Sequence, residues 1–331
     1  MRVAVAGAGA WGTALAHQLA GNGHGVMLWA REPDVALAIN RDRQNPRFLP
    51  SIQIHPSVQA TNEMGLALHG AEIIVYVAPS HVLREVVRAG TTEVGADALL
   101  VVATKGIERQ SLALMTEVVS AECHGRGVVA LSGPSFAMEV ARGHPTAIVA
   151  ASESPKAAEA VQRILSGSTL RIYTNDDVRG VELGGALKNV MAVATGIAEG
   201  LDLGLNSRAA LITRGLAEMT RLGVALGARA ATFAGLAGMG DLVLTCTGSL
   251  SRNRAVGLDV GKGIPLRDIL AGRDSVAEGV INTESAWALA RRERVDMPIV
   301  EAVHRILFEN QTPRQAMSEL MSRELRAEHD Q

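Results

Sequence analysis

The sequence is poor in cysteine and carries almost no net charge. Cys123 and Cys246 are its two cysteines, and neither lies in a Cys-x-x-Cys or Cys/His pattern with metal-ligand spacing. This excludes a disulfide framework, and no metal is expected. Thirty-two basic and thirty-four acidic residues leave a net charge of −2, so no overall field attracts nucleic acid or an anionic membrane. A reducing cytoplasm suits this composition best.

Long continuous apolar runs are also lacking. The two longest helical apolar patterns contain Lys188 and Arg214, and no run reaches the roughly 18 consecutive apolar residues of a membrane span. Gly7, Gly9 and Gly12 interrupt the stretch near the N-terminus that resembles a signal peptide. We find no repeat of fixed period and no low-complexity tract. No stable membrane insertion is therefore expected.

The remaining features describe a globular chain of 331 residues, 47% of them hydrophobic, which suggests two domains at about 150 residues each. The first half alternates short β-branched runs with helical patterns, which indicates βαβ units. The runs are continuously apolar, as expected for a parallel sheet covered on both faces. The expected strands are 2–6, 26–30, 73–78, 99–104, 128–131, 147–151 and 170–173, with a helix over 11–20.

Beyond Asn175-Asp176-Asp177 the apolar spacing becomes helical. The pattern predicts helices over 181–201, from an N-cap at Asn206-Ser207 to 226, and over 283–292, 298–308 and 313–325. The last two begin with proline, which is favoured at the first helical position. We therefore expect an α/β domain over 1–178 and an all-helical domain over 179–331.

A glycine-rich turn joins the first strand to the first helix. Gly7-Ala8-Gly9-Ala10-Trp11-Gly12 has the spacing that a dinucleotide-binding turn needs, because each glycine permits a tight turn or a close backbone approach. The N-terminus of the following helix attracts pyrophosphate. This predicts a Rossmann-type, doubly wound, mostly parallel sheet. Arg31, after the second strand, either attracts a 2′-phosphate or pairs on the surface with Asp34, so the choice between NAD(H) and NADP(H) stays open.

Two segments of the second half are candidates for chemistry. Lys188 lies beside the apolar stripe of its helix, one turn after Gly184-Gly185. Partial burial would lower the pKa of a lysine and make it a proton donor or acceptor, whereas a lysine extending from a helix boundary to solvent is the alternative. The glycine-rich segment 238–245 and the turn Ser251-Arg252-Asn253-Arg254 resemble a phosphate site. A solvated basic turn is the alternative for Arg252 and Arg254.

Loops that follow strands of the first domain add further candidates, because ligands of open α/β sheets bind there. Lys105 follows one strand and could neutralise a substrate anion. Ser135, in Ser132-Gly133-Pro134-Ser135, could donate a hydrogen bond. His81 follows another strand, and a positional role is preferred for it over a catalytic one.

Taken together, these motifs closely resemble the bacterial NAD(P)-dependent glycerol-3-phosphate dehydrogenases over nearly the whole chain. The resemblance implies reversible reduction of dihydroxyacetone phosphate to sn-glycerol 3-phosphate, a phospholipid precursor, and a homodimer. It implies that Lys188 is the general acid/base. The implied substrate-site residues are Lys105, Gly133, Ser135, Lys188, Asn189, Asp241, Thr245, Ser251, Arg252 and Asn253. The implied cofactor contacts are Gly7, Gly9, Ala10, Trp11, Gly12, Arg31, Lys105, Ala137, Arg252, Val276 and Glu278.

One position departs from the family pattern, since relatives often carry serine where this chain has Ala10. Backbone N–H groups can still hold the pyrophosphate there. Two other functions remain as alternatives: a related dehydrogenase of another hydroxy acid, such as a ketopantoate or 6-phosphogluconate type, and a non-catalytic NADP(H)-binding sensor. The first would need a carboxylate clamp, and the second would need neither Lys188 nor Asp241.

Overall fold

The computed structural model describes residues 1–271, 278–325 and 327–328, and its contacts divide the chain into two compact units. The first unit is Met1–Lys105 with Ala113–Glu182, and the second is Gly106–Leu112 with Leu183–Gln331. We expected the division at 178/179. The contacts place it after Glu182 and assign 106–112 to the second unit, where Arg109 Nη2 pairs with Glu284 Oε1 at 2.8 Å.

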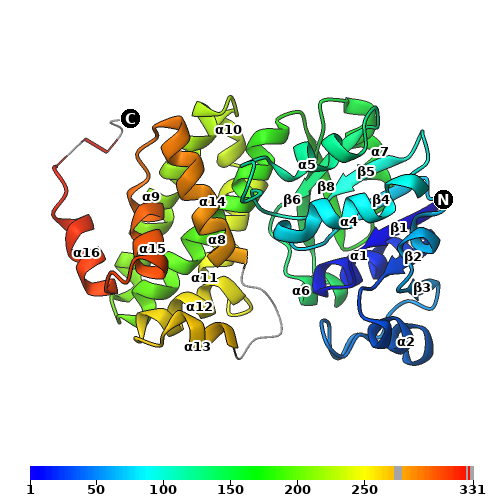
Figure 1. Ribbon diagram of the computed structural model, residues 1–331, viewed down its shortest axis with the longest axis horizontal. Coiled ribbons are helices and arrows are strands. Elements are labelled where there is room, and N and C mark those ends of the chain that lie inside the picture. Colours follow the sequence, from blue (N-terminus) through cyan, green and yellow to red (C-terminus); the bar gives the residue numbers. More distant parts are fainter. Residues whose placement is uncertain (272–277, 326, 329–331) are drawn as a thin grey trace. The chain divides into compact units, whose positions relative to one another are not determined.

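The first unit is built on one eight-stranded sheet (Figure 1). Its strand order is β3-β2-β1-β4-β5-β6-β7-β8, and every neighbouring pair is parallel except β6 with β7. The predicted doubly wound, mostly parallel sheet is thereby confirmed. The strands are β1 (Arg2–Ala6), β2 (Gly25–Trp29), β3 (Val58–Thr61), β4 (Ile73–Tyr76), β5 (Leu99–Val102), β6 (Val128–Ser132), β7 (Thr146–Ala151) and β8 (Leu170–Asn175).

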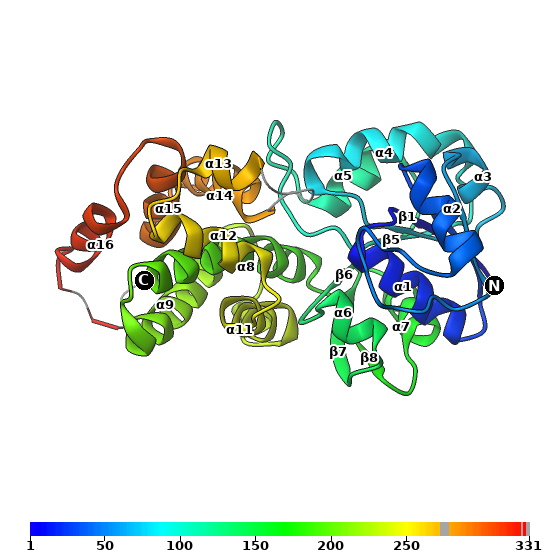
Figure 2. The same ribbon diagram turned by 90° about the horizontal axis from the view of Figure 1, so that it is seen from below.

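Helices cover both faces of the sheet, which explains the continuously apolar strands. One core joins the sheet to α1 (Ala10–Gly21), α2 (Pro33–Asp42) and α7 (Pro155–Leu165). A second core joins it to α3 (Met64–Leu68), α4 (Leu83–Gly90) and α5 (Met115–Glu122). Figure 2 shows α1 and α7 on one side of the strands and α4 and α5 on the other. Shorter elements are η1 (Ser80–Val82), η2 (Thr91–Glu93) and α6 (Ala137–Ala141).

The seven predicted strands are present, with ends shifted by one or two residues at most, but β3 was missed. β3 has four residues, Val58–Thr61, and forms one edge of the sheet. Its side chains alternate between buried and more exposed positions, because an edge strand is only partly covered. Such a short alternating run carries too little apolar signal to separate it from a loop.

The described residues of the second unit form helices and connecting segments without a strand. Figure 1 labels the long helices α8, α9, α14 and α15. The elements are α8 (Val178–Gly200, which begins in the first unit), α9 (Gly204–Ala225), α10 (Ala230–Phe233), the π-helical turn η3 (Leu236–Gly240), α11 (Asp241–Thr247), α12 (Arg252–Gly261), α13 (Leu266–Ala271), α14 (Glu278–Glu293), α15 (Pro298–Phe308) and α16 (Pro313–Met321).

Several helix boundaries of this unit differ from the prediction: α14 begins at Glu278 instead of 283, and α16 ends at Met321 instead of 325. Two further local predictions were wrong. Helix α9 begins at Gly204, before the expected cap at Asn206-Ser207, and the Ser207 hydroxyl donates to the Leu203 carbonyl at 3.0 Å. The segment expected to be a turn at 251–254 is the start of α12, with Ser251 as its N-cap. A serine hydroxyl can either cap a helix or bond to a carbonyl one turn earlier within it, so a serine in the sequence does not by itself mark where a helix begins.

Paired glycines bring α8 and α12 into backbone contact. Gly196 and Gly200 lie on α8, and Gly257 and Gly261 lie on α12. A Cβ added at Gly196 would lie 2.1 Å from the carbonyl oxygen of Arg254, and one at Gly257 would come equally close to a carbonyl of α8. Since no larger side chain fits, the glycines set how closely the two helices approach.

One stretch, 230–247, is long and apolar enough by composition to span a membrane, and 44% of it is buried. In the structure it is divided among α10, η3 and α11, with Gly235 between the first two. It also contains Asp241, which is fully buried and ion-paired. These features are those of an interior segment of the helical unit.

Two buried glutamates bind the first turns of other helices. Glu182 on α8 accepts hydrogen bonds from the Thr116 N–H at 2.9 Å and from its hydroxyl at 2.5 Å, at the start of α5. Glu218 on α9 accepts from the N–H groups of Ile299 and Val300 at the start of α15. Burial raises the pKa of Glu182 to about 7 and that of Glu218 to about 8.

Candidate functional site

The glycine-rich turn of the first unit has no room for side chains at two of its glycines. Gly7 has φ +130°, which a residue with a Cβ rarely adopts. A Cβ at Gly12 would lie 1.8 Å from the Gly7 carbonyl oxygen. Beside Gly9, in contrast, an added Cβ would meet nothing within 4 Å. The turn is therefore packed against the protein at Gly7 and Gly12 and open at Gly9, as a pyrophosphate-binding turn requires.

The start of α1 is available to an anion. Gly9 is its N-cap and supplies no capping side chain, so the first backbone N–H groups have no side-chain acceptor from it. Ala10, Trp11 and Ala137 pack on one small apolar cluster that includes Leu49. Trp11 Nε1 is buried and lacks a hydrogen-bond partner in the described part of the chain. The fold thus brings Ala137 to the predicted cofactor contacts at the glycine turn.

The strand order reverses at β1, which lies between β2 and β4. In open α/β sheets the carboxyl ends of the strands at such a reversal form the ligand-binding edge. The loops after β4, β5 and β6 are linked there. Thr104 Oγ1 donates to the Ala78 carbonyl at 2.7 Å, while Lys105 Nζ and Ser135 Oγ both donate to the Gly133 carbonyl at 2.9 Å. Lys105, Gly133 and Ser135 therefore form one cluster.

Other predicted positions of this unit are more exposed. Arg31 pairs with Glu32, with Nη2 and Oε1 2.7 Å apart, and its side chain is 76% exposed. The expected alternative partner, Asp34, is not the residue that it contacts. His81 lies exposed in η1. An exposed arginine with one surface partner can exchange it for a phosphate, so the structure leaves the 2′-phosphate hypothesis open.

In the second unit Lys188 and Asp241 form a buried ion pair. Lys188 on α8 is 7% exposed and Asp241, the first residue of α11, is 0% exposed; Lys188 Nζ donates to Asp241 Oδ1. The expected close approach beside Lys188 is also present, because a Cβ at Gly184 would lie 2.4 Å from the carbonyl oxygen of Ala237. Removing one partner of a buried pair leaves an uncompensated charge, so the two residues depend on each other.

Small polar groups of α11 surround this pair. The Thr245 hydroxyl donates to the Asp241 carbonyl at 2.6 Å and also lies 3.4 Å from Asp241 Oδ1. Cys246 is fully buried, and burial raises the pKa of its thiol to about 12. A thiol that keeps its proton is a poor nucleophile. The lysine and the carboxylate are therefore the groups suited to proton transfer.

Arg252 and Arg254 begin α12 together but differ in their partners. Arg254 Nη1 pairs with Glu199 Oε2, which also accepts from Arg208 Nη2 at 3.0 Å. Arg252 is exposed and has no hydrogen-bond or ion-pair partner among the described residues. Ser251 caps the helix by accepting from the Arg254 N–H at 3.2 Å. The guanidinium of Arg252 is thus available to bind an anion at the N-terminus of a helix.

A side-chain hydrogen bond joins the lysine and arginine segments across 64 residues of sequence. Asn253 Nδ2 donates to Asn189 Oδ1 at 2.9 Å. The Gly279 N–H donates to Asn253 Oδ1, also at 2.9 Å. The sequence analysis did not include Gly279 among the site residues, although it follows Glu278, one of the implied cofactor contacts. Glu278 is the first residue of α14 and Val276 lies outside the described residues.

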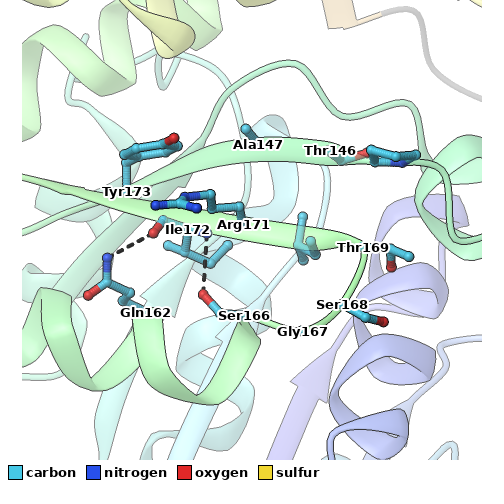
Figure 3. Close-up of a pocket in the computed structure, with 12 residues that line it drawn as sticks. Thr146, Ala147, Gln162, Ser166, Gly167, Ser168, Thr169, Arg171, Ile172 and Tyr173 are labelled. Atoms are coloured by element: carbon cyan, nitrogen blue, oxygen red, sulfur yellow. Dashed lines mark hydrogen bonds between the residues drawn. The ribbon is translucent and has the colours of Figure 1, made fainter.

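An open groove of about 640 Å³ lies elsewhere in the first unit, along the edge strand β8 (Figure 3). It contains none of the predicted site residues. Figure 3 shows Gln162 and Ser166 against Ile172: the Gln162 amide donates to the Ile172 carbonyl at 2.8 Å, and Ser166 Oγ accepts from the Ile172 N–H at 3.3 Å. These bonds occupy backbone groups that another strand would need, as expected for a protected sheet edge.

The fold and these two groups of residues define a two-domain nicotinamide-dependent dehydrogenase with a Rossmann-type sheet. Residues 2–158 match the family model for the N-terminus of NAD-dependent glycerol-3-phosphate dehydrogenase, and residues 177–318 match the model for its C-terminus. The chain therefore belongs to the NAD(P)-dependent glycerol-3-phosphate dehydrogenase family. It is an oxidoreductase that uses NAD(H) or NADP(H).

Individual relatives agree with this assignment. The glycerol-3-phosphate dehydrogenase [NAD(P)+] of Syntrophotalea carbinolica is 52% identical over 333 residues and covers 100% of both chains. The crystal structure of the Coxiella burnetii glycerol-3-phosphate dehydrogenase is 42% identical, with a TM-score of 0.94, and the match covers 97% of this chain and 99% of that one. The Saccharomyces cerevisiae enzyme is 26% identical with a TM-score of 0.81, over 96% and 98% of the two chains.

Proposed function

We propose that this chain reversibly reduces dihydroxyacetone phosphate to sn-glycerol 3-phosphate with NADH or NADPH. One observation carries the proposal within the helical unit: the Asn189–Asn253 hydrogen bond holds together the segment with the buried Lys188 and the segment with the available Arg252. A proton donor and an anion-binding group on two segments joined in this way suit a small phosphorylated carbonyl compound.

The first unit fits the dinucleotide. Gly7 and Gly12 close the turn against the protein, while the open space beside Gly9 and the N–H groups of α1 would hold the pyrophosphate. Ala10, Trp11 and Ala137 share one apolar cluster, with Arg31 at the end of the neighbouring strand. When bound, the reduced nicotinamide supplies a hydride to a carbonyl carbon. Lys105, Arg252, Val276 and Glu278 are the further proposed cofactor contacts.

Lys188 is the proposed general acid. Its ammonium group would give a proton to the C2 oxygen of dihydroxyacetone phosphate as that oxygen gains negative charge, and would take the proton back in the oxidation. Asp241 accepts a hydrogen bond from Lys188 and so orients the ammonium group. Because Asp241 is fully buried, water does not compete strongly for that bond.

Arg252 is the proposed phosphate ligand, with Ser251 and Asn253 beside it. Binding the phosphate, which does not react, would hold the carbonyl in place for reaction. The remaining proposed substrate-site residues are Lys105, Gly133, Ser135, Asn189, Asp241 and Thr245. Lys105 and Ser135 donate to the Gly133 carbonyl, which places an ammonium group and a hydroxyl at the same carbonyl.

The cell context is also a proposal. sn-Glycerol 3-phosphate is the backbone precursor of phospholipids, so we propose that the enzyme works in the cytoplasm to supply their synthesis. Two buried thiols, Cys123 and Cys246, suit a reducing compartment. We also propose a homodimer. Exposed apolar side chains of the helical unit, among them Leu205, Met239 and Val243, are available for a subunit contact, and light scattering would give the mass in solution.

The test measures oxidation of NADPH and NADH by the purified protein. The absorbance of the reduced nicotinamide is monitored with and without dihydroxyacetone phosphate. We expect cofactor oxidation that depends on this substrate, and reduction of NAD⁺ or NADP⁺ with sn-glycerol 3-phosphate. Ketopantoate and 6-phosphogluconate, assayed in the matching direction, are the controls. Turnover with one of those controls alone would favour the other hydroxy-acid dehydrogenase, and cofactor binding without turnover on any of them would favour the sensor.

A further inference from the structure

Three segments that carry proposed functional residues meet at the side chain of Asn253. Asn189 follows Lys188 on α8, Asn253 follows Arg252 on α12, and Gly279 follows Glu278 on α14. Asn253 Nδ2 donates to Asn189 Oδ1 at 2.9 Å, and Asn253 Oδ1 accepts from the Gly279 N–H at 2.9 Å. One amide therefore joins three helices, each next to a different proposed role.

The direction of these bonds follows from the backbone. The N–H of Gly279 can only donate, so it requires the oxygen of the Asn253 amide. The nitrogen of that amide must then point to Asn189 and find an oxygen there. The Asn189 nitrogen is left to face the Gly185 carbonyl, one turn earlier on α8, at 3.5 Å. A single backbone group thus sets the orientation of both side chains.

The packing around Gly279 leaves no room for a larger side chain at that position. A Cβ at Gly279 would lie 2.7 Å from the Asn189 carbonyl oxygen and 3.0 Å from Asn253 Oδ1. The glycine contacts between α8 and α12 hold those helices at backbone distance, so a side chain as short as asparagine spans the gap. The close approach of all three helices and the polar bridge between them are therefore linked.

We infer that Asn253 is a positioning residue that couples the start of α14, with its proposed cofactor contact, to the segments of the proton donor and the phosphate ligand. The inference rests on the proposed function and goes beyond a substrate contact by Asn253. It requires that the Asn253 side chain influence cofactor binding when no substrate is present. A residue that only binds substrate would have no such influence.

The experiment compares Asn253→Ala with Asn189→Ala. Asn253→Ala removes both bonds, whereas Asn189→Ala leaves the bond to Gly279. We expect Asn253→Ala to raise the NADPH Kd of the substrate-free protein about fivefold, the effect of losing one hydrogen bond of ~1 kcal/mol, and to lower kcat roughly tenfold. Asn189→Ala should lower kcat and leave that Kd unchanged. NADPH fluorescence titration gives the Kd.

Asn22→Ala is the matched control, because the Asn22 amide donates to two backbone carbonyls, those of Ile164 and Ser166, at the far end of α1. It should lower the Tm and change neither constant. If Asn253→Ala raises only the KM for dihydroxyacetone phosphate, Asn253 is a substrate contact alone. If it lowers only the Tm, its role is structural alone.

Asn253→Ser, whose side chain is too short for either bond, is the second variant in case the alanine protein does not fold, and the same Kd increase is expected. The NADPH Kd is measured without turnover, so failure of this inference can be distinguished from failure of the proposed reaction. A wild-type protein without dihydroxyacetone phosphate reduction overturns the proposed function, whereas an unchanged NADPH Kd in a folded Asn253 variant overturns this inference.

Discussion

The two proposed anion-binding sites, one in each unit, are built in different ways. In the first, the glycine turn presents backbone N–H groups, and its fit depends on side chains that are missing at Gly7, Gly9 and Gly12. In the second, side chains make the site: Lys188 is held by Asp241, and Arg252 lacks a partner among the described residues. A backbone site is therefore encoded within a few consecutive residues, while a side-chain site needs residues far apart in sequence.

The largest effect should come from Lys188. Lys188→Ala should lower kcat about 10²–10⁴-fold, the usual contribution of a general acid, and leave the NADPH Kd of the substrate-free protein unchanged. Stopped-flow turnover and fluorescence titration measure the two quantities. Lys156→Ala, at an exposed position of α7, is the control and should change neither. Near-normal turnover of Lys188→Ala would remove Lys188 from the acid role.

The two arginines of α12 should separate binding from stability. Arg252→Ala should raise the KM for dihydroxyacetone phosphate roughly 10–100-fold, because a hydrogen bond to a charged group contributes about 1.5–3 kcal/mol, with little change in Tm. Arg254→Ala should instead lower the free energy of unfolding by ~1–3 kcal/mol, since Glu199 loses a partly buried partner. Steady-state kinetics and thermal unfolding test the pair, and the opposite pattern would reverse the two assignments.

Within the backbone site, Gly9 and Gly12 should behave differently. Gly9→Ala adds a methyl group to open space, so the protein should fold normally, with an NADPH Kd raised about tenfold by the methyl group near the pyrophosphate. Gly12→Ala places the methyl 1.8 Å from a carbonyl oxygen and should lower the free energy of unfolding by ~1–3 kcal/mol. Equal Kd values for wild type and Gly9→Ala would show that the cofactor does not approach this turn.

A smaller effect concerns pH. The pKa of Glu218 is raised from 4.5 to about 8 in the folded protein, so between these values the folded state binds more protons than the unfolded state. The free energy of unfolding should therefore fall as pH rises through this window, by at most ~1.4 kcal/mol per pH unit from this group. Glu218→Gln should reduce that slope in denaturant titrations at pH 5 to about 8.5.

Glu182 in the first unit, whose pKa is raised to about 7, should contribute a similar slope that ends at lower pH. Glu218→Gln should therefore have its clearest effect above pH 7. Glu159→Gln, at an exposed position of α7, is the control and should leave the slope as in wild type. A slope that is the same in Glu218→Gln and wild type would contradict the raised pKa.

Local patterns predicted the parts of the fold that depend on neighbouring residues. The helix expected over 298–308 is α15, because its proline start and apolar spacing lie in one stretch. The edge strand β3 was missed because half of its side chains are not buried. The segment 236–247 was expected to form a site but not a helix, because glycines disfavour helices unless packing compensates. Packing does require a glycine at position 238, since a Cβ there would lie 2.2 Å from the Phe233 carbonyl oxygen.

The dinucleotide turn and the parallel sheet could be predicted from the sequence alone, because they follow from glycine spacing and from the apolar pattern of single elements. The sequence left the burial of Lys188 open, and the structure shows that this lysine is buried. Which arginine of α12 is available depends on tertiary packing, since Glu199 and Arg208 come from two other helices. The same packing decides that Asn253 joins Asn189 to Gly279. A side chain's partners depend on how distant segments pack, and no local pattern records that.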